Sequence, residues 1–150
     1  MIKLIVGKKG TGKTKQLIDM MNDSVAKVNG NIVCIEEGME STFNVNSNIR
    51  LIDIDEYKID SYDRFYGFFA GVLAGNYDIE QVYIDGLMRI GAKDLDEIGK
   101  LLELIDGVSG DKKVVVTISA DEESLPASIK KYLSYVRISL VCLSYTYFSQ

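Results

Sequence analysis

Short runs of apolar residues alternate along the chain with longer segments in which apolar residues recur every three or four positions. The short β-branched runs are typical of strands, and the longer periodic segments are typical of amphipathic helices. This pattern predicts strands at residues 2–6, 31–35, 49–54, 82–85 and 114–118. It predicts helices at residues 13–28, 61–75 and 94–108, a short helix marked by Leu125, Ile129 and Leu133, and a β-rich C-terminus over residues 136–147.

This alternation predicts the fold class. Strands separated by helices imply right-handed crossovers, so we expect an α/β fold of three layers with a mainly parallel sheet of five to six strands. Residues 2–6, 82–84 and 114–118 are mainly apolar without strict alternation, which fits strands that are covered on both faces. The sequence contains no repeat, linker or low-complexity tract, so we expect residues 1–150 to form a single domain.

A glycine-rich segment follows the first expected strand and matches the pattern G-x-x-x-x-G-K-[ST] in full: Gly7, Lys8, Lys9, Gly10, Thr11, Gly12, Lys13 and Thr14. Glycines let the backbone wrap around a phosphate so that its N–H groups converge there, and the next helix adds partial positive charge. We expect Lys13 to reach the β- and γ-phosphates and the Thr14 hydroxyl to bind Mg²⁺. The eight residues are therefore predicted to bind a nucleoside triphosphate, and the absence of a guanine-specifying N-K-x-D sequence favours ATP.

The distribution of charge supports an anionic ligand near the start of the chain. The formal net charge is −5, yet residues 1–15 contain five of the 17 basic residues and no acidic residue. A cluster of basic residues on an otherwise acidic protein fits a small anionic ligand, and the negative net charge argues against a broad nucleic-acid-binding face. Lys8 stands where one subgroup of dimeric P-loop ATPases has a lysine that enters the partner's site. That subgroup has two glycines where this chain has Lys9 and Gly10, so we expect Lys8 to face solvent near the phosphates.

A carboxylate that orders Mg²⁺ should end a second apolar strand, and two segments offer one. We assign Asp85, which ends the strand at residues 82–85, because this strand is the cleaner of the two and another strand follows at helix spacing. The competing segment at residues 51–56 offers Asp53, Asp55 and Glu56. These three acids would then lie at the rim of the site or contact a substrate.

A nucleotide hydrolase also needs a group that orients the attacking water. Asp85 is followed by Gly86, so this group does not directly follow the metal-binding carboxylate. Glu36 and Glu37 end the second expected strand at the same edge of the sheet, and we assign them as candidate catalytic bases. The alternative for this pair is a solvated turn.

The order of these parts resembles that of RecA-like ATPases, which include recombinases, replicative helicases and circadian-clock ATPases. That resemblance implies a base on the strand after the P-loop helix, a later Walker B carboxylate, and an additional strand between the P-loop and Walker B strands. Residues 32–38, 50–53 and 82–86 occur in the corresponding order. The chain is also similar to small bacterial proteins labelled twitching-motility-ATPase-like, which implies ATP binding. It has no histidine, so it lacks the histidine motif of true motility ATPases and we expect no motor function.

Two further features leave alternatives open. Gly67, Gly71 and Gly75 recur every four residues, which fits either close packing of their helix on the sheet or a self-association face. Thr117 and Ser119 end the strand expected beside the P-loop strand, where a hydroxyl could sense the γ-phosphate or simply end a strand.

Cysteine usage indicates a reducing compartment. Cys34 and Cys142 lie in apolar surroundings and are expected to be buried free thiols. The uncharged stretches are too short to span a bilayer, and the chain starts without the pattern of a signal peptide. We therefore expect a cytoplasmic protein with no membrane partner.

The function that these features favour is Mg²⁺-ATP binding with slow RecA-like ATPase activity. One alternative is a small-molecule or nucleotide kinase, whose acceptor would be framed by residues 37–49 or 53–60. A second is a non-hydrolysing, ATP-dependent binding module, which the glycine after Asp85 motivates. A homo-oligomer is also open, because Arg89 follows Asp85 closely and could act as an arginine finger between subunits.

Overall fold

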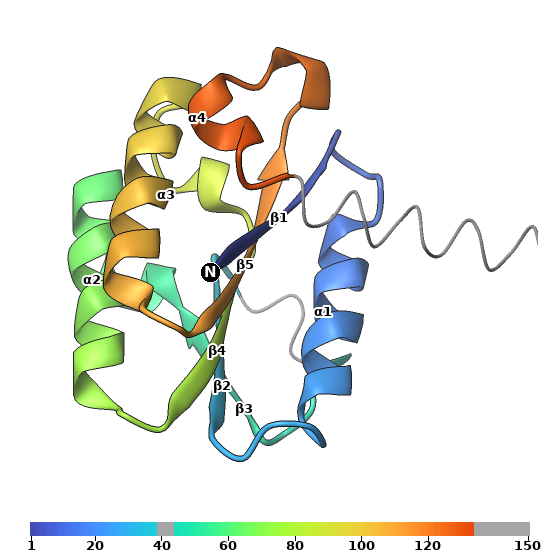
Figure 1. Ribbon diagram of the computed structural model, residues 1–150, viewed down its shortest axis with the longest axis vertical. Coiled ribbons are helices and arrows are strands. Elements are labelled where there is room, and N and C mark those ends of the chain that lie inside the picture. Colours follow the sequence, from blue (N-terminus) through green and yellow to red (C-terminus); the bar gives the residue numbers. More distant parts are fainter. Residues whose placement is uncertain (39–43, 134–150) are drawn as a thin grey trace, which may run out of the picture.

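The computed structural model describes residues 1–38 and 44–133 (Figure 1). The strands in this part of the chain are β1 (Ile2–Gly7), β2 (Asn31–Glu36), β3 (Ile49–Asp53), β4 (Ile79–Ile84) and β5 (Lys113–Ser119). The α-helices are α1 (Lys13–Ser24), α2 (Tyr62–Gly75), α3 (Leu95–Ser109) and α4 (Ala127–Lys130). Short 3-10 helices are η2 (Ile54–Tyr57), η3 (Leu87–Arg89) and η4 (Glu122–Ser124). The predicted alternation of strands and helices is confirmed, and the predicted β-rich C-terminus lies outside the described residues.

The five strands form one sheet in the order β1-β5-β4-β2-β3, and every neighbouring pair is parallel. This arrangement confirms the predicted α/β fold with a parallel sheet of five strands. β5 lies between β1, which leads into the glycine-rich loop, and β4, which ends just before Asp85. Because all strands run the same way, their carboxyl ends meet at one edge of the sheet, where ligands bind in such folds.

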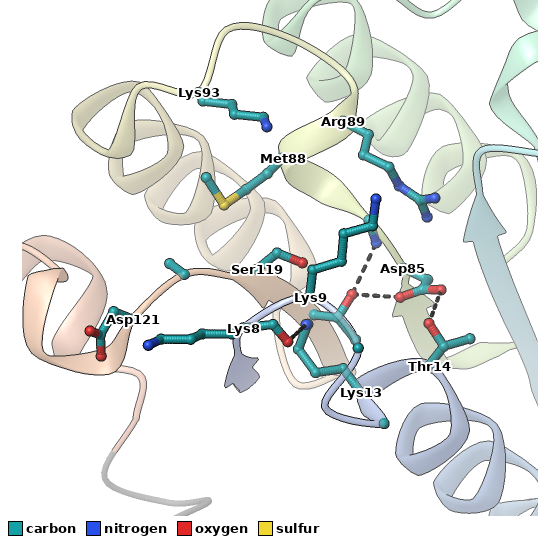
Figure 2. Close-up of a pocket in the computed structure, with 15 residues that line it drawn as sticks. Lys8, Lys9, Lys13, Thr14, Asp85, Met88, Arg89, Lys93, Ser119 and Asp121 are labelled. Atoms are coloured by element: carbon teal, nitrogen blue, oxygen red, sulfur yellow. Dashed lines mark hydrogen bonds between the residues drawn. The ribbon is translucent and has the colours of Figure 1, made fainter.

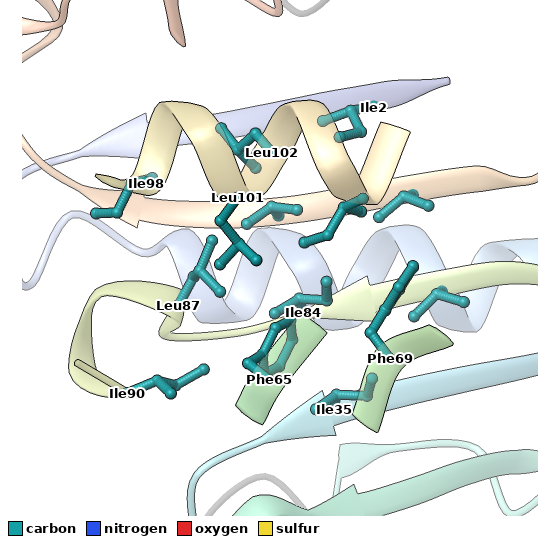
Figure 3. Packing of buried hydrophobic residues seen from close by; sticks show 14 of the residues in the cluster. Ile2, Ile35, Phe65, Phe69, Ile84, Leu87, Ile90, Ile98, Leu101 and Leu102 are labelled. Carbon is teal, nitrogen blue, oxygen red and sulfur yellow. The ribbon is translucent and has the colours of Figure 1, made fainter. Parts of the chain in front are cut away.

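Helices cover both faces of the sheet, with α1 on one face and α2, α3 and α4 on the other (Figure 1). The larger core lies between the sheet and α2–α4, where Phe65 and Phe69 pack against strand residues such as Ile35 and Ile84 (Figure 3). The smaller core lies under α1 and includes Leu17, Met21, Cys34, Tyr83 and Val115. Successive strand residues therefore point to opposite faces, and this alternation decides where the polar residues at the strand ends lie.

Local sequence explains where two of the helices begin. α2 begins after Ser61, whose Oγ accepts a hydrogen bond from Arg64 N at 3.2 Å. α3 begins after Asp94, whose carboxylate accepts one from Asp96 N at 2.9 Å. α1 ends at Ser24 and not near residue 28 as predicted, and the hydroxyl of Ser24 donates back to Met20 O at 3.0 Å.

The glycine stripe of α2 does not pack on the sheet. The buried side chains of α2 are Tyr62, Phe65, Phe69 and Leu73. Gly67, Gly71 and Gly75 lie on the exposed side, and a Cβ added at any of the three would meet no atom within 4 Å. The interpretation of this stripe as a close contact with the sheet is therefore wrong, because the aromatic residues at helical spacing take that face.

Across residues 1–38 and 44–133, no helix is long and apolar enough to cross a membrane.

Candidate functional site

The glycine-rich loop joins β1 to α1 at the carboxyl edge of the sheet. Gly10 and Gly12 have φ angles of +82° and +87°, the left-handed region that glycine adopts without steric cost. Thr11 donates to the carbonyl oxygen of Lys8 through both its N–H, at 3.3 Å, and its hydroxyl, at 2.7 Å. The ammonium group of Lys13 donates to the same carbonyl at 2.9 Å. The loop is thus a closed turn, with Lys13 folded over it at the start of α1.

The charge of Lys13 lies in a partly desolvated position. Partial burial lowers the pKa of its ammonium group, and the nearby carboxylate of Asp85 opposes this shift. A charge that water solvates incompletely interacts more strongly with an anion brought next to it. Lys13 is therefore suited to bind an anion in the adjoining cavity.

Asp85 is held by hydrogen bonds from two other elements (Figure 2). Thr14 Oγ1, in the first turn of α1, donates to Asp85 Oδ2 at 3.0 Å. Thr117 Oγ1, near the end of β5, donates to Asp85 Oδ1 at 2.6 Å and accepts a hydrogen bond from Gly86 N at 2.9 Å. The residue is only 7% exposed. The structure thus brings the two predicted metal-binding residues together and orients the carboxylate through both of its oxygens.

Strand register explains this network. Ile84 pairs with Val116 across β4 and β5, which places Asp85 beside Thr117 one residue further on. Tyr83 and Val115 belong to the core under α1, so alternation directs Asp85 and Thr117 toward α1 as well. Two roles were left open for the Thr117 hydroxyl, sensing of a γ-phosphate or an ordinary strand end, and in this structure the hydroxyl contacts Asp85.

The acidic residues of the competing segment at residues 51–56 do not line the cavity beside the glycine-rich loop. Asp53 ends β3, the edge strand that β5, β4 and β2 separate from β1. Its Oδ1 accepts hydrogen bonds from Gly38 N at 2.9 Å and Asp55 N at 3.0 Å, so it closes the turn into η2. Asp55 and Glu56 lie within η2. This arrangement favours Asp85 over Asp53 as a metal ligand beside the loop.

A cavity of about 670 Å³ extends from the loop over the ends of β4 and β5 (Figure 2). More basic than acidic residues line this cavity. The basic residues are Lys8, Lys9, Lys13, Arg89 and Lys93, and the acidic residues are Asp85 and Asp121. The backbones of Gly10, Gly12 and Gly86 and the side chains of Met88 and Ser119 also line it. The volume is that of a small-molecule site, and the excess of cations favours an anionic occupant.

The two glutamates at the end of β2 point in different directions. Asp85 N donates to Ile35 O at 2.9 Å, so Glu36 lies next to Asp85 at the end of the neighbouring strand. Alternation from Cys34, which packs under α1, directs Glu36 to the α1 face, where it is 4% exposed. Glu37 has left the strand and forms an ion pair with Arg89, with 3.8 Å between Oε2 and Nε. Within the described ranges, neither glutamate is part of the cavity wall.

The thiol of Cys34 is buried next to the carboxylates of Glu36 and Asp85. Burial raises the pKa of this thiol strongly, and the charges of Glu36 and Asp85 raise it further. This agrees with strand alternation, which places Glu36 two residues after Cys34 on the α1 face. The expectation of a buried free thiol is confirmed for Cys34, and Cys142 lies outside the described residues.

The donors at the loop fit Mg²⁺. A threonine hydroxyl and a carboxylate are the hard oxygen ligands that this ion prefers, and Mg²⁺ usually keeps several waters or phosphate oxygens as its other ligands. In the portion of the chain that the structure describes, no group of three or more acidic or cysteine side chains is arranged to hold a metal ion by itself. Thr14 and Asp85 would therefore complete a metal site only together with a phosphate-bearing ligand.

One relationship at this edge was not expected from the sequence, namely the contact of Arg89 with Glu37 of its own chain. The alternative drawn from the sequence was an arginine finger that acts on another subunit. The residue in the sequence that could have indicated this contact is Gly86, because a glycine directly after Asp85 allows a sharp turn of the backbone there. Its φ angle of +74° turns the chain into η3 and brings Arg89 back toward the end of β2.

No protein-family model and no curated protein sequence matches this chain. Among solved structures, it is similar to domain III of the replication initiation protein DnaA from Thermotoga maritima, with a TM-score of 0.46 and 17% sequence identity. The match covers 89% of this chain and 51% of the DnaA chain, so this chain spans about half the length of that structure.

Proposed function

We propose that this protein binds Mg²⁺-ATP and hydrolyses it slowly, as a RecA-like ATPase. The observation that carries the proposal is the 3.0 Å hydrogen bond from Thr14 to Asp85, directly behind a glycine-rich loop that ends in Lys13. The loop sequence supports a triphosphate ligand, and the position of Asp85 supports a metal ion beside that ligand.

Each part of the site has a separate role in this proposal. The N–H groups of residues 7–14 and the Lys13 ammonium bind the β- and γ-phosphates. Thr14 and Asp85 hold Mg²⁺, which when bound neutralises charge on the phosphate oxygens. Thr117 keeps the carboxylate of Asp85 in one orientation through its 2.6 Å hydrogen bond.

Glu36 is the better placed of the two candidate bases. It lies beside Asp85 on the α1 face, the same face as the Thr14 hydroxyl, whereas Glu37 is paired with Arg89. A carboxylate next to the metal-binding carboxylate can accept a proton from a water that attacks the γ-phosphate. The strand order supports a RecA-like arrangement, because β5 lies between β1 and β4 and because Glu36 ends the strand that follows α1.

Calorimetric titration with ATP, ADP and GTP in the presence of Mg²⁺ tests nucleotide binding. Replacing Lys13 by alanine should weaken ATP binding at least about tenfold, because it removes charge-assisted hydrogen bonds to phosphate. Lys15→Ala is a matched control, since Lys15 lies exposed on the same helix and does not line the cavity. Unchanged ATP affinity in the Lys13 variant would refute the site.

Phosphate release tests the assignment of the base. Glu36→Gln should spare ATP binding and slow turnover by about 100-fold or more, in keeping with the loss of a general base. Glu37→Gln should slow turnover less. If neither variant changes turnover, the base is assigned wrongly, and if the unaltered protein binds ATP without releasing phosphate, the non-hydrolysing binding module is the better account.

The extent of the cavity favours a kinase as the second candidate function. The cavity continues past the loop to Met88, Lys93 and Asp121, which leaves room for an acceptor next to the phosphates (Figure 2). The segments that were expected to frame an acceptor, residues 37–49 and 53–60, contribute no described residue to this wall. A panel of small hydroxylated and phosphorylated metabolites should stimulate ADP release if the protein is a kinase, and no member should do so if it is an ATPase.

A further inference from the structure

Arg89 has a fixed backbone and an exposed side chain. Its N–H donates to Gly86 O at 2.9 Å within η3, and the neighbouring Leu87 and Ile90 are buried in the larger core. The Arg89 side chain is 52% exposed. The core therefore holds the Cα of Arg89 at the cavity wall, while solvent leaves its guanidinium group able to change partner.

The guanidinium group lies against Gly86, the residue directly after the metal-binding carboxylate. A Cβ added to Gly86 would collide with Nε and Nη2 of Arg89. Gly86 also has a φ angle of +74°, which side chains other than glycine rarely adopt. Glycine at this position thus allows the guanidinium group of Arg89 to lie against the backbone that directly follows Asp85, in the wall of the cavity that Thr14 and Lys13 also line (Figure 2).

The ion pair between Arg89 and Glu37 is weak. Asp85 already accepts hydrogen bonds from Thr14 and Thr117. The partner of Arg89 is Glu37, at 3.8 Å, and the Glu37 side chain is 35% exposed. Ion pairs this long and this exposed to water contribute little free energy, so another anion in the cavity can replace Glu37.

A terminal phosphate is a stronger partner than this carboxylate. The planar guanidinium group offers paired N–H donors that match two phosphate oxygens, and a terminal phosphate carries more negative charge than a carboxylate. We propose that Arg89 binds the terminal phosphate of ATP bound to its own chain, and that Glu37 holds Arg89 when this phosphate is absent. When Arg89 binds the γ-phosphate, it releases Glu37 at the end of β2. This release changes the surface next to Glu36.

This inference rests on the proposed function, since it requires a triphosphate in the cavity. It differs from an arginine finger between subunits, because every group involved belongs to one chain. It predicts that Arg89 distinguishes ATP from ADP, which lacks the phosphate in question, and that Glu37 competes with ATP for Arg89.

The test is calorimetric titration of Mg²⁺-ATP and Mg²⁺-ADP into the unaltered protein, Arg89→Ala, Glu37→Gln and the double variant. Arg89→Ala should weaken ATP binding about tenfold, as expected for a charge-assisted pair, and change ADP binding less than about twofold. Glu37→Gln should tighten ATP binding by about two- to fivefold, the range that exposed ion pairs supply, with ADP unchanged. The double variant should equal Arg89→Ala, because Glu37 acts only through Arg89. Arg89→Lys should recover part of the preference for ATP.

Arg64→Ala is the matched control. Arg64 forms an exposed ion pair with Asp60 at 3.0 Å and does not line the cavity, so its loss should leave both affinities unchanged. Equal weakening of ATP and ADP by Arg89→Ala, or a Glu37→Gln effect that persists without Arg89, would overturn the inference alone. Absence of any nucleotide binding by the unaltered protein would overturn the proposed function and the inference together. Unchanged melting temperatures show that the variants are folded, since both side chains lie at the surface.

Discussion

The hydroxyl of Thr14 donates a hydrogen bond of 3.0 Å to the carboxylate of Asp85, although the two residues are 71 positions apart in the chain. Their contact depends on β5, which lies between β1 and β4 and supplies Thr117 as the second partner of Asp85. A loop that can wrap a phosphate and a carboxylate that can hold a metal ion are thereby placed side by side.

Replacing Asp85 by asparagine should remove the response of ATP binding to Mg²⁺. Asparagine keeps the size of the side chain and an oxygen that can accept from Thr14, but it lacks the negative charge that attracts the ion. Titrations of ATP in Mg²⁺ and in EDTA should differ about tenfold or more in the unaltered protein and little in the variant. Asp121→Asn is the control, because Asp121 lines the cavity away from Thr14 and should leave the Mg²⁺ response intact. A full Mg²⁺ response in Asp85→Asn would contradict the assignment.

Replacing Thr117 by valine should destabilise the fold. The hydroxyl of Thr117 donates to Asp85 and accepts from Gly86 N, and the residue is 2% exposed. Valine has nearly the same shape but removes the hydrogen-bond partner of Gly86 N and of Asp85 Oδ1, so the free energy of unfolding should fall by about 1–3 kcal/mol. Urea denaturation measures this change, and Thr117→Ser should retain most of the stability because it keeps the hydroxyl. A valine variant as stable as the unaltered protein would show that the network contributes nothing to folding.

Replacing Gly67 or Gly71 by alanine should stabilise the protein. Both glycines lie on the exposed side of α2 with no atom within 4 Å of an added Cβ, and alanine in a helix interior is favoured over glycine by about 0.5–1 kcal/mol. Thermal or urea unfolding measures the gain.

Gly99→Ala is the contrasting control for the α2 glycines. Gly99 is buried in α3, and a Cβ there would collide with the side chain of Ser128. This variant should therefore be less stable than the unaltered protein. Sedimentation should show the same mass for the unaltered protein and the α2 variants, and a change of mass would instead assign the exposed glycines to self-association.

Cys34 should be inert toward thiol reagents in the folded protein. The thiol is 1% exposed, and burial together with the charges of Glu36 and Asp85 raises its pKa, so the reactive thiolate is scarcely formed at pH 8. In a Cys142→Ser variant, a colorimetric disulfide reagent should detect no thiol under native conditions and one thiol after unfolding in urea. Rapid reaction of the native variant would show that the region under α1 opens readily.

The sequence alone determined the elements of this protein and the position of its glycine-rich loop. Both are local properties, because apolar periodicity requires only that one side of each element be buried. The pattern of residues 7–14 likewise lies within a single turn between β1 and α1. Local periodicity was less reliable at the end of α1, where apolar residues continue to residue 28 but the helix ends at Ser24.

Only the tertiary structure decided which polar residues meet at the strand ends. Strand order makes Asp85, and not Asp53, the acid beside Thr14, and alternation along β2 separates Glu36 from Glu37. The exposed position of Gly67 and the contact of Arg89 with its own chain were decided in the same way. Such contacts depend on strand order, register and the competition of neighbouring side chains for one face, and none of these is encoded in a short segment of sequence.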